Sequence, residues 1–110
     1  MKQFLVIYYA PAEAVGNMES MTQKEKMASL KPWMDWKAAH DKNILNFGAP
    51  LMPGQDRNGT KEWKGSTKQV SGFSIVQSEN IEGAKAMCTN HPHLSWSDAC
   101  SLGVYEFAPM

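Results

Sequence analysis

Two of the chain's three histidines stand together in one short segment, His91-Pro92-His93. An unperturbed imidazole titrates near pH ~6.5, so either ring could give or take a proton at neutral pH without a large pKa shift. Proline fixes its own φ and disfavours helical geometry in the residue before it, so His91 should be extended or in a turn. Side chains two apart in extended backbone point the same way, and we expect both rings to face one site.

The spacing supports two interpretations of this turn. In the first, His91 and His93 are catalytic residues, a carboxylate from Asp98 or Glu106 orients one ring, and Tyr8 supplies a hydroxyl. In the second, both imidazoles hydrogen-bond to the loop backbone and hold the turn. The sequence leaves both interpretations open.

A metal site is disfavoured at this turn. Zinc uses sulfur and nitrogen ligands, but a Cys-x-x-His-x-His segment followed by a lone cysteine is not a standard spacing; the set would be Cys88, His91, His93 and Cys100. We therefore expect no metal and no cofactor. Two cysteines are also too few for a disulfide framework, and Cys88 is predicted to be a reduced core residue on a helix.

An aromatic stripe on a second segment is a candidate ligand wall. Trp33, Trp36 and His40 share one face of a predicted helix. Large aromatics are also typical of cores and subunit interfaces, and that interpretation carries the greater weight. As a wall for a flat ligand, the stripe joins Tyr8 and Asp98 in the predicted ligand-binding set.

The elements that must position these residues begin with an apolar strand over residues 2–9, predicted to be buried on both faces. A helix should start at the capping box of Thr22 and Glu25 and run to about Asn43. Pro32 should either kink it or divide it into two short helices. Its predicted core face consists of Met27, Leu30, Met34, Ala38 and Leu45.

The middle of the chain changes composition. Residues 44–51 predict a short strand in which Gly48 permits a bulge. Residues 52–67 are polar and rich in glycine, which is typical of a long hairpin connection or a lid. Trp63 stands out within them as a candidate ligand cover or a residue packed on the base of the loop.

The last third predicts a strand, a helix and a strand. Residues 69–77 carry alternating apolar side chains, and residues 101–107 make the final strand. Asn80 can cap the helix between them, which should end near Asn90. The buried face of that helix is predicted to be Ile81, Ala84, Met87 and Cys88. The loop over residues 12–21 has no assignable chemistry.

This order of elements predicts an α+β ferredoxin-like βαββαβ fold. Four antiparallel strands would carry both helices on one face, in a single domain over residues 1–110. The other face of the sheet would then be uncovered, and a homodimer that stacks two sheets is the simplest way to bury it.

Composition excludes several function classes. Eleven basic and eleven acidic residues cancel, and no basic stripe is present, so nucleic acid is not an expected partner. No apolar run approaches the roughly 20 residues of a membrane helix. The short apolar start contains Gln3, Tyr8 and Tyr9 at or in it and is not expected to be a signal peptide. We expect a soluble, cytoplasmic protein.

Several segments together resemble the YCII-related family: Phe4-Leu5 with Tyr8-Tyr9, Gly48-Ala49-Pro50-Leu51, Gly72 to Gln77, His91-Pro92-His93-Leu94 and Val104 to Met110. The resemblance implies a dimeric α/β barrel. It also implies no established reaction, because most members have none. The founding branch pairs a helix histidine with a turn aspartate, and the matching positions here are near Trp33 and at His91.

The resulting expectation is a homodimer with a small-molecule pocket, which either binds a ligand or performs cofactor-free acid/base chemistry through histidine. A lyase, isomerase or hydrolase step would suit that chemistry. The alternatives are a non-catalytic structural or interaction domain, and a monooxygenase-like enzyme that shares the same barrel.

Overall fold

The computed structural model describes residues 1–11, 21–96 and 98–109. The loop predicted over residues 12–21 lies, except for Met21, outside the described residues. In chain order the elements are β1 (Lys2–Tyr9), α2 (Gln23–Ala39), the 3-10 turn η1 (Asp41–Asn43), β2 (Ile44–Pro50), β3 (Gln55–Asp56), β4 (Lys64–Gly65), β5 (Val70–Ser78), α3 (Ile81–Met87), the 3-10 turn η2 (Pro92–Ser95) and β6 (Ser101–Glu106).

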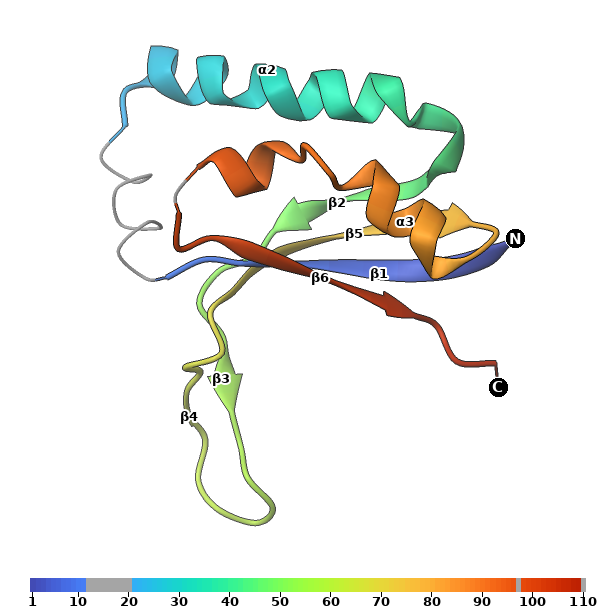
Figure 1. Ribbon diagram of the computed structural model, residues 1–110. Coiled ribbons are helices and arrows are strands. Elements are labelled where there is room, and N and C mark those ends of the chain that lie inside the picture. Colours follow the sequence, from blue (N-terminus) through green and yellow to red (C-terminus); the bar gives the residue numbers. More distant parts are fainter. Residues whose placement is uncertain (12–20, 97, 110) are drawn as a thin grey trace.

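The main sheet confirms the predicted fold. Its strands lie in the order β2-β5-β1-β6, and all neighbouring pairs are antiparallel. Figure 1 shows α2, α3 and η2 together on one side of this sheet, while the other side carries no helix. The small β3-β4 hairpin projects away from the helices (Figure 1). The architecture is the α+β ferredoxin-like arrangement that the sequence predicts.

The central strand β1 alternates sharply in burial. Phe4, Val6 and Tyr8 point to the helices and are at most 4 % exposed. Leu5 and Ile7 point to the uncovered side and are half-buried. Because side chains alternate across a strand, this single chain buries one apolar face fully and leaves a second apolar face partly open to water.

The start of α2 is as predicted, and Pro32 does not divide the segment into two short helices. Thr22 Oγ1 accepts from the amide of Glu25, and the Thr22 amide donates to the Glu25 carboxylate, which completes a capping box. One helix continues through Pro32 to Ala39, where it ends earlier than predicted. No helix in the described part of the chain combines the length and the apolar character needed to cross a membrane.

The predicted core face of α2 is wrong. The helix turns Trp33 and Trp36 toward the sheet, and Trp36 is only 6 % exposed. Helical spacing identifies stripes but does not decide which stripe faces the sheet, and the two indoles bury more area than the methionines and leucine would. The stripe predicted as core is exposed instead, at Met27, Leu30, Met34 and Ala38.

Strand β2 contains the bulge predicted at Gly48. This glycine has φ +82°, and a Cβ placed on it would overlap the carbonyl oxygen of Phe73 on β5. The side chain of Asn46 accepts from the Gly48 amide at 2.8 Å and holds the distortion. Leu45 belongs to this strand and not to the helix, and it is exposed.

Helix α3 is capped by Asn80, whose side chain accepts from the Gly83 amide at 2.9 Å. The predicted buried face is correct at Ala84, Met87 and Cys88. It is wrong at Ile81, the first helical residue, which is 41 % exposed because the end of the helix extends past the packed part of the layer.

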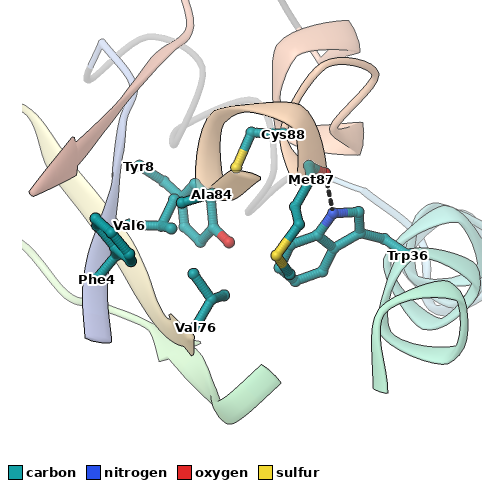
Figure 2. Packing of buried hydrophobic residues seen from close by; sticks show 8 residues of the cluster. All are labelled: Phe4, Val6, Tyr8, Trp36, Val76, Ala84, Met87 and Cys88. Carbon is teal, nitrogen blue, oxygen red and sulfur yellow. Dashed lines mark hydrogen bonds between the residues drawn. The ribbon is translucent and has the colours of Figure 1, made fainter. Parts of the chain in front are cut away.

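The core lies between the sheet and the two helices. Figure 2 shows the indole of Trp36 reaching across to α3, where its N–H donates to the carbonyl of Met87 at 2.8 Å. A buried indole N–H needs such a partner, and this bond ties α2 to α3. The buried cluster consists of Phe4, Val6, Tyr8, Trp36, Val76, Ala84, Met87 and Cys88.

Candidate functional site

The two histidines of the turn are almost completely buried. His91 is 1 % exposed and His93 is 2 % exposed. His91 is extended, with φ −64° and ψ 136°, and is followed at once by η2, which confirms the backbone geometry predicted from Pro92. The Nδ1 atom of His91 accepts from the amide of His93 at 3.0 Å. The ring of His91 therefore caps the turn that its own backbone enters.

A chain of side-chain hydrogen bonds runs from His91 into the sheet, and its direction is fixed. A carbonyl can only accept, so the hydroxyl of Ser74 donates to the carbonyl of Phe47 at 2.7 Å. Ser74 then accepts from the hydroxyl of Tyr8, also at 2.7 Å. Tyr8 has no second proton, so its oxygen accepts from Nε2 of His91 at 3.0 Å. His91 is thus a neutral imidazole that carries its proton on Nε2.

Burial keeps these groups uncharged. Desolvation lowers the pKa of His91 to about 3, with smaller contributions from the neighbouring His93 and His40. Desolvation also raises the pKa of Tyr8 above its ordinary value. The pKa of His93 is lowered by burial as well, against the opposing effect of hydrogen bonds to the backbone of Tyr9 and Ser101. At neutral pH the site is an array of neutral hydrogen-bonding groups.

Aromatic rings pack closely around this array. The ring of Trp33 lies 4.8 Å from that of His91 and 5.1 Å from that of Tyr8, in edge-to-face contact with both. Trp36 lies 4.4 Å from His91, and His93 lies 5.1 Å from Tyr8. Trp36 is buried, but Trp33 is only half-buried. Of the rings in this cluster, Trp33 is therefore the one that is partly exposed to solvent.

The remaining predicted residues lie at the edge of the cluster or outside it. His40 is the half-exposed C-cap of α2, with its ring 5.9 Å from that of Trp36. Asp98 is exposed, and Glu106 pairs with Lys2 at 3.3 Å on the surface. The structure thus brings together Tyr8, Trp33, Trp36, His91 and His93, and neither carboxylate bonds to a histidine ring.

Sequence reasoning missed two members of the hydrogen-bond chain, Ser74 and the carbonyl of Phe47. Ser74 could have been found from the alternation of side chains along β5, because it lies on the same face of the strand as the buried Val76. A buried serine on such a face needs a partner. The carbonyl of Phe47 could not be predicted from the sequence, because its direction depends on the bulge at Gly48.

Two hollows in the described structure have volumes of about 220 Å³ and 300 Å³. The first lies on the β3-β4 hairpin, and the second lies at the end of α2 and includes His40. Neither includes the Tyr8–His91 pair.

No group of three or more metal-ligating side chains comes together among the described residues. The cysteines are unpaired with each other and buried. Desolvation raises the pKa of the Cys88 thiol to about 11, so it is protonated at neutral pH and is a poor nucleophile.

No protein family and no curated protein matches the sequence. Among solved structures, the chain is similar to 5-chloro-2-hydroxyhydroquinone dehydrochlorinase (TftG) from Burkholderia phenoliruptrix AC1100, in a complex with 2,5-dihydroxybenzoquinone. The TM-score is 0.54 at 16 % sequence identity, over 96 % of this chain and 93 % of that chain. The likeness supports the fold.

Proposed function

We propose that the protein is a YCII-related homodimer that binds a small, flat, oxygen-bearing molecule between α2 and η2. The observation that carries this proposal is the half-exposed Trp33, whose ring covers the wholly buried Tyr8–His91 hydrogen bond. A ligand that displaces or stacks on this indole reaches a phenol and an imidazole. Aromatic walls with a few fixed polar groups are typical of small-molecule sites.

Neutral polar groups suit an oxygen-bearing ring. A hydroxyl or carbonyl oxygen can exchange hydrogen bonds with Tyr8 or His91 without bringing a charge into a desolvated site. The protein of similar fold is described in complex with 2,5-dihydroxybenzoquinone, a flat ring with four oxygens. This supports a flat, oxygen-bearing ring as the ligand, which the desolvated site would take in an uncharged form.

If the site also transfers protons, His93 is the better candidate. Both nitrogens of His91 are engaged, Nδ1 with the His93 amide and Nε2 with Tyr8. Its low pKa also makes it a weak base at neutral pH. The Nε2–H of His93 donates to the carbonyl of Tyr9 at 2.8 Å, so Nδ1 is the nitrogen that would take a proton. Hydrogen bonds to the backbone of Tyr9 and Ser101 favour the protonated form of this ring. Cofactor-free lyase, isomerase or hydrolase chemistry would use Nδ1.

The resemblance to the YCII-related family favours binding over an inherited reaction. The resemblance puts the histidine of the founding branch near Trp33 and its aspartate at His91, and the rings of Trp33 and His91 lie 4.8 Å apart here. The same location in the fold thus holds an indole and a neutral imidazole. An ion-pair mechanism cannot operate with these two groups.

The homodimer in this proposal uses the uncovered face of the sheet. Leu5 and Ile7 on β1 lie beside Ile75 and Phe73 on β5, and all four are half-buried in the single chain. Two such faces packed about 10 Å apart would complete a barrel and remove this apolar surface from water.

Binding can be measured as stabilisation by hydroquinone, a flat ring that is uncharged at pH 7, with the saturated cyclohexane-1,4-diol as the matched control. Unfolding is followed by circular dichroism. At 100 times the dissociation constant, stabilisation should reach about 2.7 kcal/mol. Stabilisation by hydroquinone alone, lost in Trp33→Ala, supports the proposal. No stabilisation by a panel of uncharged dihydroxybenzenes and hydroxybenzamides would contradict it.

The close packing of the rings around the buried His91 favours a second candidate, a non-catalytic interaction domain whose aromatic rings are only core. This candidate predicts that Trp33→Ala lowers stability equally with and without the panel. The ligand titration of the wild-type and variant proteins therefore separates the two functions.

A further inference from the structure

Two segments that carry exposed apolar side chains have no role in the site described above. The first is the arm, residues 52–68, which contains the β3-β4 hairpin and the exposed Trp63, at 62 %. The second is the α2 stripe, defined as Met27, Leu30 and Met34, at 64 %, 55 % and 50 % exposed. Isolated exposed apolar residues are common, but a methionine-rich stripe and a tryptophan on a projecting hairpin are typical of contact surfaces.

The arm is bonded within itself. Its hydrogen bonds and ion pairs in the described structure join arm residues, for example Ser66 to Gly54 at 2.9 Å and Lys68 to Asp56 at 3.7 Å. An isolated two-stranded hairpin is only marginally stable in water. An arm of this kind gains stability when another surface covers it.

The base of the arm is firmly attached and sets its direction. Gln69 has a left-handed φ of 59°, and its carbonyl accepts from the Ala10 amide at 2.8 Å. On the other side, the Leu51 amide donates to Ser71 at 2.9 Å. A left-handed non-glycine residue persists only where its surroundings hold it. The arm therefore leaves the sheet at a fixed point, on the side away from the helices (Figure 1).

We propose that, in the homodimer, the arm of one subunit extends past the sheet of the second copy and places Trp63 on the α2 stripe of that copy. This inference rests on the proposed sheet-to-sheet dimer. The second copy is the partner because the arm projects on the side away from the helices, which is the side of the sheet that the dimer covers (Figure 1).

The length of the arm suits this contact. From Val70 to Trp63, extended chain reaches about 23 Å at ~3.3 Å per residue. Stacked sheets lie about 10 Å apart, and the partner's helices form the next layer, about 20 Å from the first sheet. Trp63 thus reaches the level of α2 in the second copy. Indole on methionine sulfur is a favourable contact, which suits Met27 and Met34.

Cysteine cross-linking tests this geometry on the full chain. A Trp63→Cys protein is mixed with a Met34→Cys protein, subunits are allowed to exchange, and mild oxidation is followed by non-reducing electrophoresis. The matched control is Ala28→Cys, an exposed position on a different face of the same helix. We expect a disulfide-linked heterodimer with Met34→Cys at least tenfold faster than with Ala28→Cys. Equal rates overturn the inference.

A second measurement separates this inference from the dimer itself. Analytical ultracentrifugation of the wild-type protein gives the oligomeric state, and a monomer would contradict both proposals. In a dimer, Trp63→Ala should raise the dissociation constant about 30-fold, as loss of an interface anchor does. A dimer whose affinity does not change in Trp63→Ala retains the sheet-to-sheet interface and refutes the arm contact.

Discussion

The oxygen of Tyr8 accepts a hydrogen bond of 3.0 Å from Nε2 of His91, although 83 positions separate the two residues in the chain. Both groups are withdrawn from water. The bond fixes the tautomer of His91 and thereby what the site can do at neutral pH. It also determines how the protein should respond to substitution and to acid.

Removal of both partners of this bond should cost less than the sum of the two single removals. Tyr8→Phe leaves the Nε2 proton of His91 buried without an acceptor, and His91→Phe leaves the Tyr8 oxygen without its donor. Each change should lower the free energy of unfolding by about 1–3 kcal/mol. The double variant should lose clearly less than the sum, because two apolar rings need no partners. Urea denaturation of the four proteins measures this, and additive losses would contradict the proposed chain.

Stability should fall as the pH falls below about 6.5. The pKa of His91 is about 3 in the native state against 6.5 ordinarily, so below 6.5 the unfolded chain binds a proton that the native protein does not. The contribution should approach about 1.4 kcal/mol per pH unit until the pH nears the native pKa. Urea denaturation at pH 7, 6 and 5 measures the slope. In His91→Phe the slope should decrease by about one proton, and an unchanged slope would refute the assignment.

Gly48→Ala should be strongly destabilising, by about 2–4 kcal/mol. The new Cβ would overlap the Phe73 carbonyl, at a residue whose φ is +82°. Gly54→Ala is the matched control, because nothing lies within 4 Å of a Cβ at that position. Thermal unfolding compares the two variants. Similar melting temperatures would show that the bulge is not needed to aim the Phe47 carbonyl at Ser74.

The thiol of Cys88 should react slowly in the native protein. Burial raises its pKa to about 11, so little thiolate is present at pH 8. A Cys100→Ser variant leaves Cys88 as the remaining thiol, and reaction with Ellman's reagent is followed with and without urea. We expect at least a hundredfold acceleration on unfolding. Rapid reaction without urea would show that the site opens readily.

Ile75→Lys should convert the proposed dimer into a folded monomer, because it places a charge in the middle of the uncovered sheet face. Leu94→Lys, on a 40 % exposed residue of η2 on the helix side, is the control and should remain dimeric. Light scattering gives the mass and circular dichroism confirms the fold. A dimeric Ile75→Lys protein would place the interface elsewhere.

The fold was predictable from local patterns. Alternation in β5, the capping box at Thr22 and the cap at Asn80 each act over a few residues, and all three are confirmed. The face of α2 that packs on the sheet was not predictable. Trp33 and Met34 lie on neighbouring stripes of the helix, and only packing against the sheet selects between the two stripes.

The site was predictable in its members and not in its chemistry. The convergence of His91 and His93 on Tyr8 follows from Pro92 and the strand order. Their neutral state depends on burial and on Ser74, which lies on a different strand. The direction of hydrogen bonds that join three strands has no local sequence signal. The sequence alone therefore predicts imidazoles that titrate near neutral pH, and it cannot show that both rings are neutral.

The central position of β1 has a consequence for synthesis on the ribosome. This first strand pairs with β5 and β6 and has no hydrogen-bonded neighbour from the first half of the chain. Its first partner is complete only at Ser78 and its second only at Glu106, and contacts between distant residues form slowly. During that interval the apolar segment Phe4 to Tyr9 is exposed to water, and completion of the Tyr8–His91 bond marks the end of that exposure.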